Sequence, residues 1–359
     1  MFQAIETNTN KATFEMHDVD LAVANAIRRT ILTDIPVVGF RGEDSPSLNV
    51  LKNNGPLHNE FMLHRFGLIP IHFNDEIVES FNTDDYEFEL YVENKGASML
   101  NVTTKDFKVR KHGSELPAKE VTQLFPANPV TKEHILITRL RQGEELHVKG
   151  QAVLDIARSH AGFSPGFCTF SYMQDPVKAA SATNVLDKER AYKRNEHGDP
   201  VAYQFRIESV CGLTPYYLVH KSLQVLRKKL DKIQTELYQD PSEYVTVRPW
   251  AGGVNETAAG EMTGMEFVFQ NEDDTLGSLL QSLMYNHYIR EKHVTERGRN
   301  VAYVGYVCPH PLERTMILRI VFEEDAPIVE YIEALAEQCR RIDGELQNVQ
   351  SEWARSQPE

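Results

Sequence analysis

Two long segments with heptad-like apolar spacing constrain the fold of this chain more than any other feature. In the first, Thr214 and Pro215 are typical of a helix start. Apolar residues then recur at alternating spacings of four and three, and a segment near the end of the sequence repeats this alternation. The two stripes consist of Val219, Leu223, Leu226, Leu230, Ile233 and Leu237, and of Ile328, Ile332, Leu335, Cys339, Ile342, Leu346 and Val349.

A 3.5-residue repeat forms a narrow apolar stripe that is buried against a nearly parallel or antiparallel partner helix. Each helix would be roughly 35–40 Å long at a rise of ~1.5 Å per residue. Two stripes of matching length therefore predict that these two helices pack on each other within one chain.

The sequence before each long helix follows the same order. A strand in 12–18 leads to a helix that starts after the N-cap candidate Asp20, and a further strand follows Pro36. The strand 265–270 likewise leads to a helix capped by Asp273. This order predicts two related units, the first formed by 1–45 plus 201–240 and the second by 265–359.

Alternating, strand-like sequence fills the region between the two parts of the first unit. It predicts an inserted β-rich domain at 46–200. Proline, glycine and small residues in 241–264 indicate a linker. The predicted fold class is α+β.

Composition excludes several classes of function. A formal charge of −14 disfavours broad contact with phosphates, so sequence-specific nucleic-acid binding is not expected. The apolar runs are too short to span a bilayer. Phosphate-loop, dinucleotide-binding and hydrolase motifs are absent from the sequence. The four cysteines lack CxxC spacing and no histidine pairs with them at ligand spacing, so neither a metal site nor a catalytic site is predicted.

Several motifs resemble the alpha-like subunits of cellular RNA polymerases: bacterial alpha, archaeal D and the eukaryotic third subunit. They are "DVDLAVANAIRRTILTDIPVVGF", "HNEFMLHRFGLIPI" and "LRQGEELHVKGQAVLDIARSHAGFSP". The motifs "NEDDTLGSLLQSLM" and "VAYVGYVCPHPLERTMILRI" resemble the small partner of these subunits, archaeal L or the eukaryotic eleventh subunit. A single-chain fusion resembles the form encoded by large cytoplasmic DNA viruses such as African swine fever virus.

The resemblance implies a non-catalytic subunit of a DNA-directed RNA polymerase, whose two halves pair as an alpha-like heterodimer. It implies docking to the largest and second-largest subunits, with small zinc-binding subunits as further partners and no homo-oligomer. The residues implied in docking are Asn25, Arg28, Arg29, His64 and Arg65. From the residues alone, the two arginines of the first helix are expected to be solvated at its surface, and His64 and Arg65 could also be only solvated.

The chain also departs from the family pattern. Some relatives carry a four-cysteine zinc loop or an iron–sulfur cluster in the inserted domain, but this region holds only Cys168. We therefore expect no cofactor. The viral resemblance implies transcription in the host cytoplasm and packaging in the virion. A free-standing protein–protein adaptor with the same fold is the alternative function, and an enzyme is a third.

Overall fold

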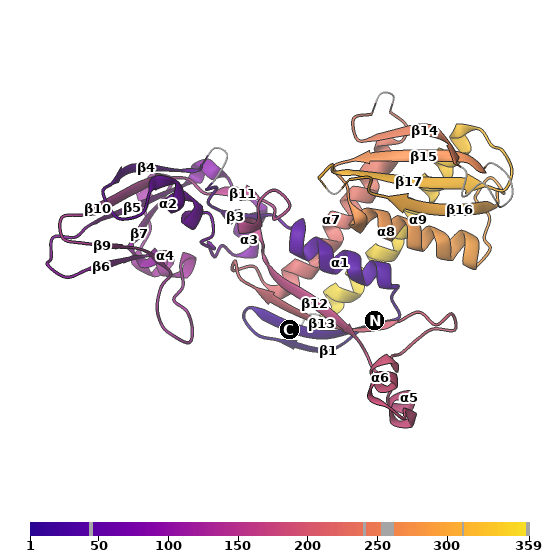
Figure 1. Ribbon diagram of the computed structural model, residues 1–359, viewed down its shortest axis with the longest axis horizontal. Helices are drawn as coiled ribbons and strands as arrows, with labels where there is room; N and C mark the ends of the chain where they lie inside the picture. Colours follow the sequence, from indigo (N-terminus) through magenta and orange to yellow (C-terminus); the bar gives the residue numbers. More distant parts are fainter. Residues whose placement is uncertain (43–45, 240–241, 253–261, 311, 357–359) are drawn as a thin grey trace.

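The computed structural model describes residues 1–42, 46–239, 242–252, 262–310 and 312–356. Figure 1 shows an elongated arrangement, with a sheet domain at one end, a helix-and-sheet unit at the other, and a second such unit between them. The mixture of antiparallel sheets and helices confirms the predicted α+β class.

The first unit is a four-stranded antiparallel sheet that carries two helices. Its strand order is β1-β2-β13-β12. The bounds are Phe2–Thr7 for β1, Lys11–His17 for β2, Gly166–Tyr172 for β12, Ala202–Ser209 for β13, Leu21–Thr33 for α1 and Pro215–Glu236 for α7. Both helices contact the sheet and each other.

The second unit repeats this plan. Its sheet has the order β14-β15-β17-β16, with a short helix after the second strand and a long helix after the last. The bounds are Val245–Gly252 for β14, Met262–Gln270 for β15, Asp274–Met284 for α8, Tyr285–Arg290 for the π-helix η4, Val301–Val307 for β16, Thr315–Phe322 for β17 and Ile328–Arg355 for α9. Thus α8 corresponds to α1, and α9 corresponds to α7.

Local chemistry explains where three of these helices begin. The side chain of Asp20 accepts a hydrogen bond from the Ala22 amide, and that of Asp273 accepts one from Thr275. Thr214 caps α7 by accepting from the Tyr217 amide. Each cap satisfies an amide that has no partner within the helix.

The inserted domain follows the short strand β3 (Val37–Gly39), which pairs with β11 (Val153–Asp155). Its five-stranded sheet has the order β4-β10-β5-β7-β8, and β6 pairs with β9. The bounds are Leu48–Asn53 for β4, Tyr86–Glu93 for β5, Leu100–Thr103 for β6, Phe107–Lys111 for β7, Ser114–Glu115 for β8, Leu136–Leu140 for β9 and Glu145–Gly150 for β10. Its helices are α2 (Asn59–Phe66), α3 (Asp75–Glu79) and α4 (Ala118–Leu124), and short 3-10 turns lie at Thr83–Asp85, Thr104–Asp106 and Ala161–Phe163.

Two predicted boundaries differ from the structure. The insertion was expected to run to residue 200, but β12 pairs with β13 in the sheet of the first unit. The linker was expected over 241–264, but β14 pairs with β15 as an edge strand. The strand β12 is separated in sequence from its partner β13 by the helical arm, and β14 lies at the edge of its sheet. Strand pairing of either kind depends on tertiary context, which local composition does not reveal. Part of the expected linker, 253–261, lies outside the described residues.

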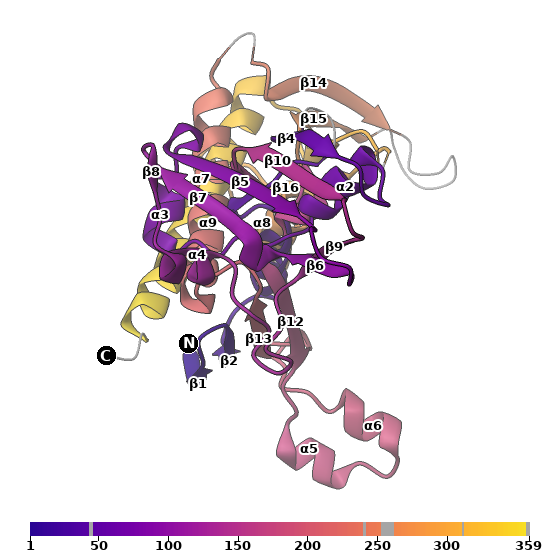
Figure 2. The same ribbon diagram turned by 90° about the vertical axis from the view of Figure 1, so that its left-hand side faces the viewer.

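A helical arm leaves the first unit between β12 and β13. It carries α5 (Pro176–Ser181) and α6 (Val185–Arg190), and Figure 2 shows it projecting away from both sheets. At its base, the rings of Tyr192 and Tyr172 lie 5.0 Å apart. None of the helices in the described ranges has the length and apolarity needed to cross a membrane.

Candidate assembly interface

The two long helices α7 and α9 pack against each other in antiparallel orientation. Arg227 near the middle of α7 contacts Asp343 of α9, with 2.7 Å between Nε and Oδ1. Tyr216 at the start of α7 lies beside Trp353 near the end of α9. These contacts place the start of one helix beside the end of the other, as Figure 1 also shows.

Most of the predicted stripe residues are buried. The five on α7, and Leu237 directly after it, are all at most 5% exposed. On α9, the buried members are Leu335, Cys339, Ile342, Leu346 and Val349. Ile332 is half-buried, whereas Ile328 is 40% exposed. The structure differs from the prediction at Ile328 because it is the first residue of α9, beyond the reach of the shorter α7.

Trp353 extends the stripe into the core of the first unit, and the sequence analysis missed it. Its indole Nε1 donates to the Tyr216 carbonyl at 3.1 Å, and its ring lies 4.9 Å from those of Phe14 and Phe2. The spacing from Leu346 through Val349 to Trp353 continues the alternation of three and four. That continuation was the signal that could have found it.

A cluster of buried and half-buried charges joins the units beside the helix pair. We call Asp34, Arg158, Lys229, Glu272 and Asp273 the charge junction. Arg158 donates two hydrogen bonds to Asp34, at 2.7 and 2.8 Å, and its third nitrogen lies 3.2 Å from Asp273. Lys229 of α7 lies 2.9 Å from Asp34 and 2.8 Å from Glu272. The junction therefore links α1, α7 and a loop of the first unit to the start of α8.

The charges of the junction stabilise one another's ionised forms. Burial alone would raise the pKa of Asp34, but Lys229 and Arg158 outweigh it and hold that pKa below its usual value. Burial alone would lower the pKa of Lys229, whereas Glu272 and Asp34 raise it. Removing any one member of such a cluster is expected to destabilise the fold, because it leaves an opposite charge without its partner.

The short helices α1 and α8 contact each other at the same boundary. Arg29 of α1 donates to the Thr275 hydroxyl at 2.8 Å, and its guanidinium lies 3.6 Å from Asp273. At the other end of α1, Asn286 donates to Asp20 at 2.8 Å. The start of α1 thus meets the end of α8, and the end of α1 meets its start.

The residues predicted to dock the large subunits separate into three groups. Asn25 and Arg28 lie together on α1, where the Arg28 Nε donates to Asn25 at 3.0 Å. Both are half-buried, and Asn25 lines a groove of about 310 Å³ between α1 and α8. Arg29 is engaged within the chain. The docking prediction did not anticipate this, because the partner Thr275 is 246 positions away.

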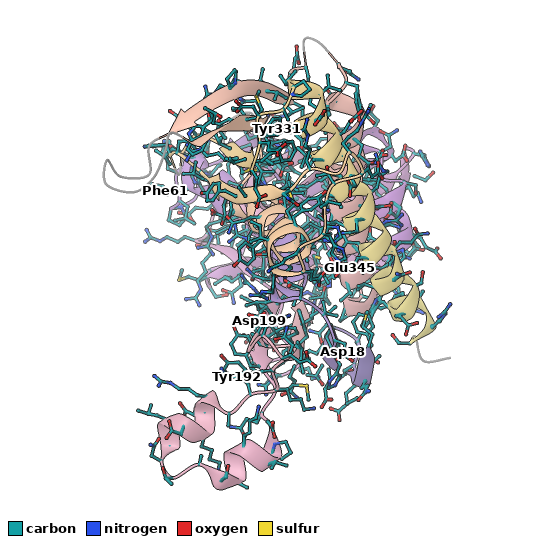
Figure 3. All side chains as sticks on the ribbon, turned by 90° about the vertical axis from the view of Figure 1, so that its right-hand side faces the viewer. Asp18, Phe61, Tyr192, Asp199, Tyr331 and Glu345 are labelled. Atoms are coloured by element: carbon teal, nitrogen blue, oxygen red, sulfur yellow. The ribbon has the colours of Figure 1, made fainter. Side chains whose placement is uncertain are left out.

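His64 and Arg65 lie on α2 of the inserted domain, and both are exposed. Arg65 donates to the Leu136 carbonyl at 2.8 Å. Phe61 and Leu68 beside them are each 67% exposed, and Figure 3 shows Phe61 at the periphery of the molecule. These two apolar side chains were not predicted as part of the site, although both stand in the motif "HNEFMLHRFGLIPI".

The cysteines have the surroundings of packing residues. Among the residues that the structure describes, all four are free thiols, and three of them are buried. Burial raises the pKa of Cys168 to about 12, so its thiol stays protonated at neutral pH.

Two units of one topology, joined by contacts between their long antiparallel helices and between their short helices, define a dimerisation module. The chain belongs to the family of RNA polymerase Rpb3/Rpb11 dimerisation domains, which matches it at residues 13–230 and again at 264–352.

Individual relatives agree with this assignment. Subunit RPAC1 of human DNA-directed RNA polymerases I and III is 28% identical over 293 residues, which cover 65% of this chain and 83% of the human protein. The bovine RPAC1 is 30% identical, and the matched residues again cover 65% of this chain and 83% of the bovine protein. Subunit Rpo3 of Thermococcus kodakarensis is 26% identical and covers 66% of this chain and 98% of its own length. The predicted membership among the alpha-like subunits of RNA polymerases is confirmed.

Proposed function

We propose that this chain is the assembly platform of a DNA-directed RNA polymerase, in which the two halves of one polypeptide replace a pair of alpha-like subunits. The observation that carries the proposal is the antiparallel contact of α7 with α9, together with the charge junction. Both join the two family domains within the same chain. Relatives with this domain are subunits of DNA-directed RNA polymerases.

A short covalent connection supports pairing within the chain. The first unit ends with α7 at Glu236, and the second unit begins with β14 at Val245. Linked partners meet at effective concentrations of order mM, so the pair would survive dilution that separates independent subunits. The stoichiometry of the two halves would be fixed at one to one.

The platform would dock the largest and second-largest subunits through α1 and α2. Asn25 and Arg28 offer a polar face on α1, and His64, Arg65 and Phe61 offer a mixed face on α2. Arginine suits such contacts because its planar fork binds carboxylates or carbonyls in two places. Exposed apolar side chains beside a charged rim are typical of binding surfaces. Arg29 would support the fold at this site instead.

We propose further that small zinc-binding subunits complete the assembly, and that the polymerase is viral. The fusion of two alpha-like units supports a viral source, because separate chains are the rule for the cellular subunits that the chain resembles. Such an enzyme would transcribe in the host cytoplasm and be packaged in the virion.

Affinity purification of the tagged chain from its native source tests the proposal. Mass spectrometry of the captured proteins should find the two large polymerase subunits. Capture of proteins unrelated to transcription would favour the free-standing adaptor. Nucleotide turnover by the isolated chain would contradict a non-catalytic platform.

A further inference from the structure

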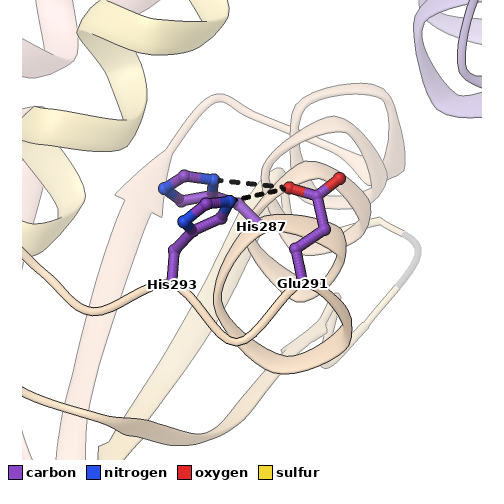
Figure 4. Close-up of side chains that lie close together, drawn as sticks. All are labelled: His287, Glu291 and His293. Atoms are coloured by element: carbon purple, nitrogen blue, oxygen red, sulfur yellow. Dashed lines mark ion pairs between the residues drawn. The ribbon is translucent and has the colours of Figure 1, made fainter.

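Three side chains of metal-ligating type converge at the end of η4. One ligand atom from each of His287, Glu291 and His293 lies within 4.8 Å of the other two. Figure 4 shows both imidazoles directed at the same carboxylate oxygen of Glu291. That oxygen lies 3.8 Å from Nδ1 of His287 and 3.3 Å from Nε2 of His293.

The backbone is shaped to bring these residues together. A π-helix covers Tyr285–Arg290. Such segments are rare in proteins, and those that occur are often found at functional sites. Lys292 then adopts a φ of 59°, in the left-handed region that a lysine seldom occupies. This residue reverses the direction of the chain, so that the His293 amide donates to the His287 carbonyl at 3.2 Å.

The two imidazoles stack with their centroids 4.4 Å apart and an angle of 23° between their planes. Burial, Arg341 and the second imidazole together lower the pKa of His287. Imidazole binds a metal through a ring-nitrogen lone pair, which both histidines can offer in their neutral form. Both ring nitrogens face the same carboxylate oxygen, so a cation placed among the three donor atoms would contact all of them.

We propose that His287, Glu291 and His293 form a binding site for a first-row divalent transition metal, of which Zn²⁺ is the representative. Donor atoms around tetrahedral zinc are about 3.4 Å apart, since its bonds measure about 2.0–2.1 Å. The observed nitrogen–oxygen distances of 3.8 and 3.3 Å are close to this separation. Small movements of the exposed Glu291 and His293 side chains would bring the three donor atoms into position. Imidazole nitrogen favours zinc, nickel or cobalt over Mg²⁺ and Ca²⁺, which prefer oxygen.

The surroundings suit a cation despite the nearby Arg341. A groove of about 390 Å³ runs from His287 and Glu291 to Asp18, Asp199 and Glu345. It is also lined by Arg290, which pairs with Asp199, and by Arg341, which lies 4.0 Å from Glu345, so the carboxylates outnumber the guanidinium groups. Figure 3 labels these three acids along that side of the molecule. Water fills the remaining coordination positions of the ion. The bound ion ties the turn at 291–293 to η4, next to the boundary where η4 meets the first unit through Asn286 and Arg290.

Zinc titration of the full, chelator-treated chain by calorimetry tests the site. The background is Cys308→Ser, which removes the only cysteine that is not buried. We expect one Zn²⁺ per chain, no competition from millimolar Mg²⁺, and a thermal midpoint that rises on zinc addition. His293→Ala and Glu291→Gln alter exposed side chains, so they should fold normally while weakening zinc affinity at least about tenfold.

The control is His58→Ala, an exposed histidine of the inserted domain, which should bind zinc as the parent does. Failure of the parent chain to bind Zn²⁺ would overturn the proposal. Unchanged stoichiometry and affinity in a folded variant that lacks all three side chains would also overturn it, because the zinc would then lie elsewhere. Neither result depends on polymerase assembly, so this test stands apart from the proposed function.

Discussion

Arg227 of α7 and Asp343 of α9 form a two-pronged ion pair across the boundary between the two halves. The guanidinium Nε and Nη2 lie 2.7 and 3.2 Å from the two carboxylate oxygens, and Nη1 donates to Gln350 at 3.0 Å. Each partner side chain is 30% exposed, so the pair lies at the rim of the buried stripe. It marks the antiparallel register of the two helices.

This register predicts a coupling between the two charges. Arg227→Glu and Asp343→Arg should each lower the free energy of unfolding by about 1 kcal/mol, because half-exposed pairs contribute modestly and each single change adds repulsion. The exchanged double variant should recover most of that loss. Urea unfolding of the four proteins in a double-mutant cycle measures the coupling. A coupling of zero would mean that the helices do not hold this register.

The buried stripe predicts a much larger effect. Leu226 and Leu335 are at most 1% exposed, and replacing either with aspartate puts an unpaired carboxylate in an apolar seam. The loss should reach several kcal/mol, a large part of the ~5–15 kcal/mol that stabilises a typical domain. Asn348→Asp on the exposed side of α9 is the control and should melt as the parent does. Parent-like melting of Leu335→Asp would show that the seam is not buried.

The heptad stripes and the helix caps could be predicted because their signals are local. Leu226 and Leu335 belong to stripes whose members lie three or four positions apart, and Asp20 and Asp273 cap amides two positions away. The strand β14 could not be predicted, because its identity depends on pairing with β15 at a sheet edge. The contact that Arg29 makes within the chain could not be predicted for a similar reason. The helix face of Arg29 was predicted, but the hydroxyl of Thr275 comes from the other half of the chain.

The charge junction predicts a dependence of stability on pH. The pKa of Asp34 is held below its unfolded value of about 3.9, so its ionised form stabilises the fold fully above that pH. This contribution should be lost as the pH falls from about 4 through the folded pKa. Asp34→Asn should lose about 3 kcal/mol at pH 7 and show a weaker dependence below pH 4. The exposed Asp231→Asn is the control, and an equal loss in both variants would argue against the junction.

The two adjacent arginines of α1 should behave differently. Arg29→Ala removes the hydrogen bond to Thr275 and should lower the free energy of unfolding by about 1 kcal/mol. Arg28→Ala should melt as the parent does, since its contact is with Asn25 on the same helix. If Arg28 docks a large subunit, its loss should weaken capture by about 2–5 kcal/mol.

Thermal melts and quantitative co-purification separate these outcomes. Arg206→Ala on β13 is an exposed arginine outside both proposed docking helices and should change neither readout. Unchanged capture with Arg28→Ala would indicate that this side chain is only solvated.

Native mass spectrometry of the polymerase captured through this chain tests the central claim most directly. One polypeptide that supplies both halves of the platform should appear as a single 41.0 kDa copy per assembly, together with one copy of each of the two large subunits. Two copies per assembly, paired through exchanged long helices, would contradict the account.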